Sequence, residues 1–138
     1  MTLLSSGLPE VVGDEEDLAR FLTQSNQYSR SSVKPSAFLP SSKDRATSVS
    51  RHGREPVETL MQLGRAAAGN RPLYGAAIIK AAAARAVGLY VCADEPPERH
   101  ALIKNWPWDN DPELQKAQQK ERALRLIAAA GQPLLFDP

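Results

Sequence analysis

The stretch "ATSVSRHGREPVETLMQLGRAAAG", residues 46–69, contains a strand signal followed by the strongest helix signal of the chain. Its first part alternates in a β-favouring context, and this alternation places Thr47, Val49 and Arg51 on one face of a strand. From Pro56 to Gly69, apolar residues recur at the three- and four-residue spacing of an amphipathic helix. The stretch therefore predicts one strand followed by one helix.

Two more helices are expected toward the ends of the chain. Residues 13–24 combine Asp14 as a cap with an acidic first turn and one apolar face, which predicts a short surface helix. A helix of about five turns is predicted between Asp111 and Gly131, which suit its two ends. Its apolar side is expected to contain Leu114, Ala117, Leu124 and Ile127.

The remaining strand signals are short. Strands are predicted at residues 36–40, 73–79 and 89–92, with a helical turn at 80–87 between the last two. A single helix from Ala76 to Val87 is the alternative, because alanine favours helix there.

These elements together predict an α+β fold. We expect a single compact domain over residues 1–138, in which a small sheet of roughly three to five strands packs with about three helices. Residues 1–13 are expected to be a flexible N-terminus. Residues 25–35 are polar and serine-rich, which predicts a mobile loop.

Composition limits the classes of function. The chain has 138 residues and a net charge of +1 at pH 7, without the general basic charge that drives nonspecific nucleic-acid binding. One cysteine, Cys92, and two histidines cannot supply a disulfide framework or the paired ligands of a zinc site. Lys80 and Arg85 interrupt the alanine-rich run at 73–93, which argues against a membrane span. We therefore expect a cytoplasmic protein with no metal, no cofactor and no membrane partner.

Three blocks of the chain resemble blocks shared by a group of small uncharacterised bacterial proteins. The blocks are "AFLP", "SVSR" and "PPERHALIKNWP". The resemblance implies a bacterial, cytosolic origin. It brings no activity, fold or cofactor with it.

Arginines and histidines are the residues with the strongest chemical signal. Residues 30–54 form a cationic segment that includes Arg30 and Arg51, and His52 follows directly. If Val49 faces the core, Arg51 needs a buried phosphate or carboxylate partner, whereas at a sheet edge it would be solvated. Arg99 and His100 follow two prolines, which present them from a stiff segment.

These residues predict a site for a phosphate-bearing ligand, either a nucleotide or RNA. Arg51, Arg99 and Arg30 would hold the phosphate, because guanidinium groups match phosphate geometry. His100 or His52 would move a proton, which would suit phosphoryl- or nucleotidyl-type chemistry. Whether the protein is an enzyme stays open at this point.

A second hypothesis is a non-enzymatic interaction module. In this hypothesis Trp106-Pro107-Trp108 anchors the chain in a pocket of a partner protein, as in an antitoxin, an immunity protein or an accessory subunit. A third hypothesis treats the same residues as structural, with Trp106 closing the core. The sequence does not decide among these hypotheses.

Overall fold

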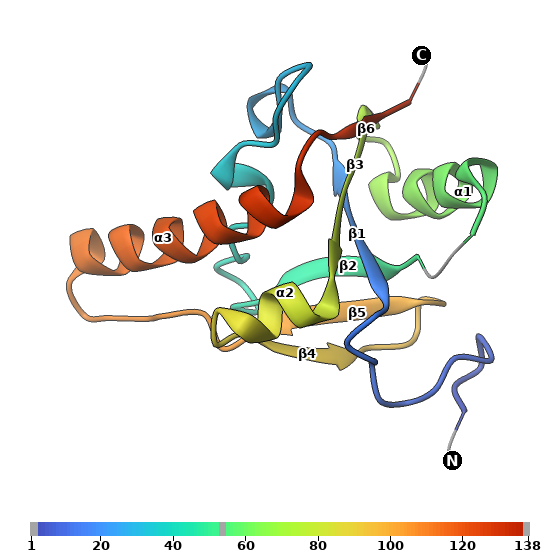
Figure 1. Ribbon diagram of the computed structural model, residues 1–138, viewed down its shortest axis with the longest axis horizontal. Helices are drawn as coiled ribbons and strands as arrows, with labels where there is room; N and C mark the ends of the chain where they lie inside the picture. Colours follow the sequence, from blue (N-terminus) through green and yellow to red (C-terminus); the bar gives the residue numbers. More distant parts are fainter. Residues whose placement is uncertain (1–2, 53–54, 137–138) are drawn as a thin grey trace.

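The computed structural model describes residues 3–52 and 55–136, which form one α+β domain (Figure 1). Within those residues, three α-helices pack on a six-stranded antiparallel sheet with the order β4-β5-β2-β1-β3-β6. The α+β prediction is confirmed, and the expected sheet of three to five strands is too small. The elements are β1 (Asp17–Leu22), the 3-10 helices η1 (Ser25–Gln27) and η2 (Pro35–Ala37), β2 (Thr47–Arg51), α1 (Val57–Ala68), β3 (Gly75–Lys80), α2 (Ala81–Ala86), β4 (Tyr90–Ala93), β5 (His100–Lys104), α3 (Pro112–Ala130) and β6 (Leu134–Leu135).

The helices divide between the two faces of the sheet. On one face, α2, α3 and η2 cover the main core, to which Leu18, Ile103 and Leu126 belong. On the other face, α1 packs on β1 and β3 over a smaller core that contains Phe21 and Leu60. Figure 1 shows α1 and α3 on opposite sides of β1 and β3. Because α1 lies over β1 and β3, the neighbouring strands β2 and β5 border a cavity on the α1 face.

The helix predicted at residues 13–24 is wrong, because this part of the chain contains the strand β1. Leu18 and Leu22 of β1 pack in the main core, and Ala19 and Phe21 pack in the smaller one. A strand that is buried on both faces is apolar on both faces, so it lacks the alternation that distinguishes a strand from a helix.

The strand predicted at residues 36–40 is also wrong. Pro35 starts the 3-10 helix η2, and proline has no N–H to donate to a strand ladder. Ala37 and Phe38 are fully buried in the main core. The backbone oxygen of Phe38 accepts a hydrogen bond of 2.6 Å from the Thr47 hydroxyl, so this turn is tied to β2.

The other predicted elements are confirmed. Thr47, Val49 and Arg51 of β2 share the buried face, as the alternation predicts. The helix α1 ends at Gly69, and the segment after it forms β3, α2 and β4 in the predicted order. The alternative of one helix from Ala76 to Val87 is therefore wrong.

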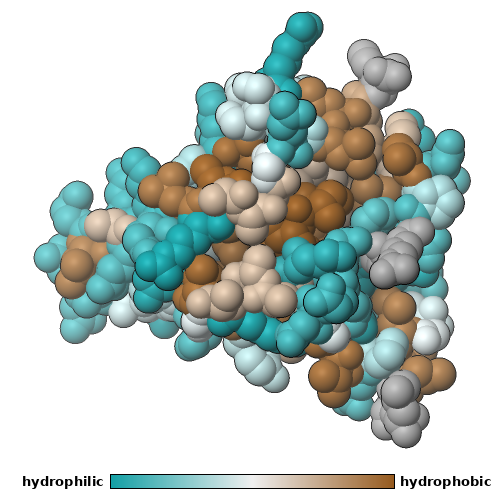
Figure 2. All heavy atoms as spheres, viewed as in Figure 1, coloured by the Kyte–Doolittle hydropathy of each residue, from teal (hydrophilic) through white to brown (hydrophobic). Residues whose placement is uncertain are grey.

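The boundaries of α3 are predicted correctly, but its buried face only in part, because Ile127 packs against the main core and the leucines of the predicted face do not. Asp111 caps the helix through its side chain, and Gly131 ends it. Leu114 and Leu124 are 45% and 46% exposed, while Ala123 and Leu126 are buried. The first turns of α3 extend past the sheet, and this outer end is mostly hydrophilic (Figures 1 and 2). Among the described residues, no helix is long and apolar enough to cross a bilayer.

Both segments that were expected to be flexible make local contacts. In the N-terminal segment, Val12 is buried in the main core, and residues 1–2 lie outside the described residues. In the loop at 25–35, Tyr28 and Val33 form an isolated antiparallel bridge. The flexibility of these segments stays a prediction.

Candidate functional site

A cavity of about 480 Å³ lies between the C-terminal half of α1 and the sheet. Its polar lining consists of two arginines, three hydroxyl groups, one histidine and one acid, which are Arg20, Arg71, Thr23, Ser48, Ser50, His100 and Glu98. The apolar lining is Phe21, Val49, Leu63, Ala66, Ala67, Ala68 and Pro97. An apolar pocket with a few convergent polar groups is the usual form of a small-molecule site.

Arg20 occupies a gap between β1 and β2. The two strands pair only at Leu18 with Arg51 and at Ala19 with Ser50, whereas β1 pairs with β3 over its whole length. Beyond these pairs, the Arg20 Nη1 donates to the Ser48 backbone oxygen at 3.0 Å and Nε donates to the Ala37 oxygen at 2.6 Å. The guanidinium group thus replaces backbone pairing at this point.

Arg71 holds the end of α1. Its Nε donates to the Ala68 backbone oxygen at 3.1 Å, which also accepts from the Arg71 amide, and its Nη2 donates to the Ala67 oxygen at 2.9 Å. These bonds help to satisfy the last carbonyl groups of the helix. Burial lowers the pKa of Arg20, and the charge of Arg71 lowers it further. Among the described residues, neither arginine forms an ion pair with a carboxylate. The cavity lining therefore contains two positive charges whose bonded partners are neutral carbonyl groups, and one acid, Glu98, that forms an ion pair with neither arginine in the described residues.

His100 is the one predicted site residue that lines this cavity. Its Nδ1 lies 2.9 Å from the Asp94 carboxylate and 3.1 Å from the Asp94 backbone oxygen. Both partners are acceptors, so Nδ1 carries a proton and Nε2 of the neutral ring has the free lone pair. Asp94 thus sets both the orientation and the tautomer of the ring.

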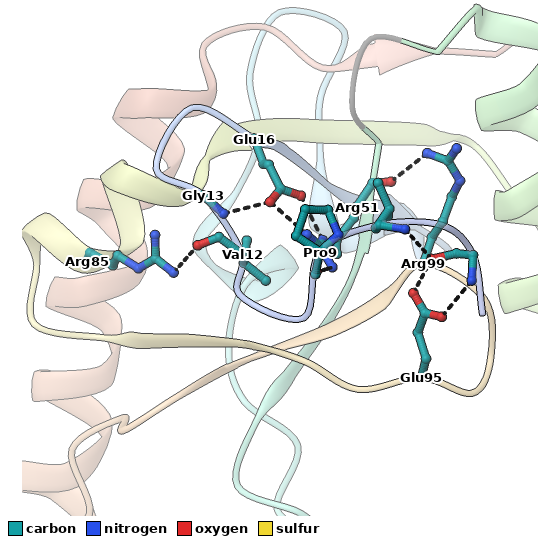
Figure 3. Close-up of polar contacts among 10 residues, drawn as sticks. Pro9, Val12, Gly13, Glu16, Arg51, Arg85, Glu95 and Arg99 are labelled. Atoms are coloured by element: carbon teal, nitrogen blue, oxygen red, sulfur yellow. Dashed lines mark hydrogen bonds and ion pairs between the residues drawn. The ribbon is translucent and has the colours of Figure 1, made fainter. Parts of the chain in front are cut away.

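Arg51 lies on the opposite face of the sheet and is fully buried. Its Nε and Nη2 each donate to a carboxylate oxygen of Glu16 at 2.7 Å, and its Nη1 donates to the Pro9 oxygen at 2.7 Å (Figure 3). Val49 does face the core, and the anionic partner that Arg51 then requires is the chain's own carboxylate.

Glu16 is held in the charged form by this arrangement. Burial raises its pKa, but hydrogen bonds from Arg51 and the Gly13 amide and the charges of Arg51 and Arg85 outweigh burial and lower the pKa below its ordinary value. The charged pair joins the N-terminal segment to β2. Figure 3 shows Glu16 between Gly13 and Arg51.

Arg99 lies next to Arg51 but not in the cavity. Its Nη2 donates to the Glu55 carboxylate at 2.8 Å, and its Nη1 donates to the Arg51 backbone oxygen at 3.2 Å. The structure therefore brings Arg51 and Arg99 together and places His100 elsewhere. Side chains of adjacent strand positions point to opposite faces, which separates His100 from the Arg51 side of the sheet.

The other predicted ligand groups also lie outside the cavity lining. Arg30 is exposed in the turn between Tyr28 and Val33. His52 is partly buried just after β2, and burial lowers its pKa. Arg54, the last residue of the cationic segment, lies outside the described residues.

The two tryptophans have partners within the chain. Trp106 is 3% exposed and packs in the main core, where its Nε1 donates to the Ile103 oxygen at 3.1 Å. The Trp108 ring lies 4.5 Å from the guanidinium carbon of Arg45, which is a cation–π contact. Trp106 therefore closes the core and is not available to anchor a partner in this structure.

Sequence reasoning missed Arg20 and Arg71. Arg20 is the one charged residue within the apolar stretch "LARFL", and this signal was hidden because the stretch was assigned to a surface helix. Arg71 stands two residues after Gly69 in a polar turn, where arginine is common, so the sequence does not indicate that it belongs to a site.

Comparisons with protein-family models, with curated protein sequences and with solved structures give no match for this chain. No group of three or more histidine, cysteine, aspartate or glutamate side chains in the described part of the chain is arranged to hold a metal ion. The chemistry of the cavity therefore has to be argued from its own residues.

Proposed function

We propose that this chain binds a phosphate-bearing ligand in the cavity beside α1, with Arg20 and Arg71 around the phosphate and His100 as the proton-transfer group. The observation that carries this proposal is the presence of two guanidinium groups in one cavity without an ion pair in the described residues. Two like charges at close range repel each other, and a phosphate between them would turn this repulsion into two attractions.

Each arginine has a donor group left for a ligand. Arg20 uses Nε and Nη1, and Arg71 uses Nε and Nη2, for backbone oxygens. Within the described residues, Nη2 of Arg20 and Nη1 of Arg71 have no hydrogen-bond partner. Because the other nitrogen atoms are tied to carbonyl groups, both forks are already oriented, which reduces the entropy that a ligand loses on binding.

The apolar side of the cavity favours a nucleotide over inorganic phosphate. Phe21, Leu63 and Pro97 supply apolar lining for a flat, weakly polar group, and Thr23 and Ser48 add hydroxyl groups to the lining. A nucleobase would cover this lining while its phosphate reaches the arginines. Arg51 and Arg99 already pair with carboxylates of the chain. Arg20 and Arg71 are therefore the residues that would bind the phosphate.

The test is a calorimetric titration of the wild-type chain with nucleoside mono-, di- and triphosphates, inorganic phosphate and a short single-stranded RNA. Salt is held at one stated concentration, since phosphate affinity depends on it. Arg71→Ala removes one exposed fork, and charge-assisted hydrogen bonds are worth about 1.5–3 kcal/mol. Nucleotide affinity should therefore fall about ten- to a hundredfold.

Arg65→Ala is the matched control. Arg65 is exposed on α1, the helix that precedes Arg71, and does not line the cavity, so its removal changes the net charge without changing the fork. Its nucleotide affinity should stay within about twofold of wild type. The proposal is wrong if the wild type binds no phosphate compound, or if folded Arg71→Ala and Arg65→Ala proteins bind equally well. If the RNA binds and the mononucleotides do not, the ligand is a longer polyanion and not a single nucleotide.

A further inference from the structure

Ser50 and His100 lie directly opposite each other on β2 and β5, and both line the cavity. The Arg51 amide donates to the Arg99 oxygen at 2.7 Å in the adjacent pair, so Ser50 and His100 form the non-hydrogen-bonded type of pair. In such pairs the two Cβ atoms are only about 4.5–5.5 Å apart. The hydroxyl and the imidazole are therefore neighbours on one surface.

Three features distinguish this pair from an ordinary polar pair on a sheet. His100 is held through Nδ1 by Asp94, so its Nε2 is the basic nitrogen. No hydrogen bond from Ser50 Oγ, to His100 or to any other group, is found among the described residues, so the hydroxyl is free to rotate toward the imidazole or a substrate. The cavity also contains the charges of Arg20 and Arg71, which suit negative charge that develops during a reaction.

We infer that Ser50 is a nucleophile for which His100 is the general base and Asp94 the positioning residue. A hydroxyl, an imidazole and a carboxylate in this order activate serine on unrelated folds. In this structure the imidazole is bonded to the carboxylate, but no hydrogen bond joins Ser50 to His100 among the described residues, so substrate binding has to bring Oγ to Nε2. The roles of the three residues follow from their own geometry, but the substrate class rests on the proposed function. The substrate is then a phosphate ester or anhydride whose phosphoryl group lies between the arginines and Ser50.

The reaction balances without a further cofactor. Ser50 Oγ attacks phosphorus and forms a P–O bond, while His100 Nε2 takes the hydroxyl proton. The bond from phosphorus to the leaving oxygen breaks, this oxygen keeps the electron pair, and His100 protonates it. Water then attacks the phosphoserine, His100 takes a proton from the water, and Ser50 Oγ leaves and recovers a proton from His100. The products are the alcohol or shorter phosphate and inorganic phosphate.

The reactivity of Ser50 can be tested without any phosphate ligand. Phenylmethanesulfonyl fluoride is neutral, and its phenyl ring suits the apolar lining that includes Phe21 and Leu63. The serine oxygen would attack sulfur, fluoride would leave, and His100 would accept the proton. Intact-mass measurement and peptide mapping of the treated wild type should show one phenylmethanesulfonyl group on Ser50.

The variants separate the three roles. Ser50→Ala should abolish labelling, whereas Ser36→Ala should retain it, because Ser36 does not line the cavity and its hydroxyl donates to the Asn26 oxygen. Loss of a general base typically costs a factor of about 100 or more, so His100→Ala should slow labelling by that amount. His100→Asn, which is closer in shape, serves the same purpose if the alanine variant does not fold.

Asp94 acts through His100, so its variant needs a different readout. Asp94→Asn should lower the maximal labelling rate and leave the reagent concentration for half-maximal rate unchanged, and Asp94→Glu should restore part of the rate. If Asp94 had a purely structural role, Asp94→Asn would change the maximal labelling rate and the reagent concentration for half-maximal rate together. The inference is overturned if wild-type Ser50 is not labelled, or if folded His100 variants label Ser50 at the wild-type rate. Failure of nucleotide binding leaves this result standing, and failure of labelling leaves nucleotide binding standing.

Discussion

Removing the charge of Glu16 should destabilise the protein strongly. The Arg51 side chain is 0% exposed and Glu16 is 21% exposed, so Glu16→Gln leaves a buried guanidinium without its counter-charge. Breaking a buried ion pair on one side costs about 3–5 kcal/mol. Because water reaches part of Glu16, we expect the lower end, about 3 kcal/mol. For a chain of 138 residues this free energy corresponds to a fall in melting temperature of about 10 °C.

The measurement is thermal unfolding followed by circular dichroism, supported by urea titration. Glu15→Gln is the matched control, because Glu15 is exposed and, among the described residues, its carboxylate forms no ion pair while its backbone oxygen accepts a hydrogen bond from Lys80. It should stay within about 0.5 kcal/mol of wild type. A double variant, Glu16→Leu with Arg51→Met, removes both charges and should recover part of the lost stability, since a well-packed apolar pair can replace a buried ion pair.

Acidification supplies the second test of the same pair. The folded-state pKa of Glu16 lies below its ordinary value of 4.5. The contribution of Glu16 to the free energy of unfolding is therefore complete above pH 4.5 and is lost as the pH falls through the lower folded-state pKa. The stability difference between wild type and Glu16→Gln should therefore shrink below about pH 4.5. If Glu16→Gln melts like Glu15→Gln, or if the difference grows in acid, the assignment of Arg51 to an internal carboxylate is refuted.

Two further predictions concern packing. Gly75→Ala places a Cβ on the Leu134 backbone oxygen, so β6 must move away from β3; we expect a loss of about 1–3 kcal/mol in urea unfolding, and an unchanged midpoint would contradict this contact. Trp106→Ala removes a buried indole together with its bond to the Ile103 oxygen, which should cost about 3–5 kcal/mol and lower the melting temperature, while wild-type stability would mean that the segment after β5 does not pack.

The sequence predicts elements well where one periodicity dominates. The alternation of β2 and the apolar stripe of α1 lie next to each other, and both are confirmed. Asp111 and Gly131 locate the ends of α3, because capping is a local property of the chain. The strand β1 was misread because cores on both faces remove its alternation, and the buried face of α3 was misread because part of the helix extends past the sheet.

The candidate site shows a sharper limit. The sequence indicates correctly that a buried Arg51 requires an anionic partner. This partner, Glu16, lies 35 positions away, so no local pattern identifies it. His100 was chosen for its stiff segment, and it does line the cavity. Arg20 and Arg71 come from β1 and the turn after α1, and only tertiary structure brings them together. The cavity lining comes from four segments, within residues 20–23, 48–50, 63–71 and 97–100. Spacing along the sequence cannot show that such segments meet.

The arginines of this chain divide by what neutralises them, and this division supports the choice of site. Arg51, Arg85 and Arg99 each contact a carboxylate of the chain, so their charge contributes to folding. Arg20 and Arg71 contact only carbonyl oxygens among the described residues, which orient a guanidinium group without cancelling its charge. Burial of the Arg20 charge without a counter-charge costs stability, and a bound anion would recover part of that cost, whereas the charge of the exposed Arg71 is solvated. Phosphate ligands should therefore stabilise the wild-type protein more than they stabilise Arg71→Ala.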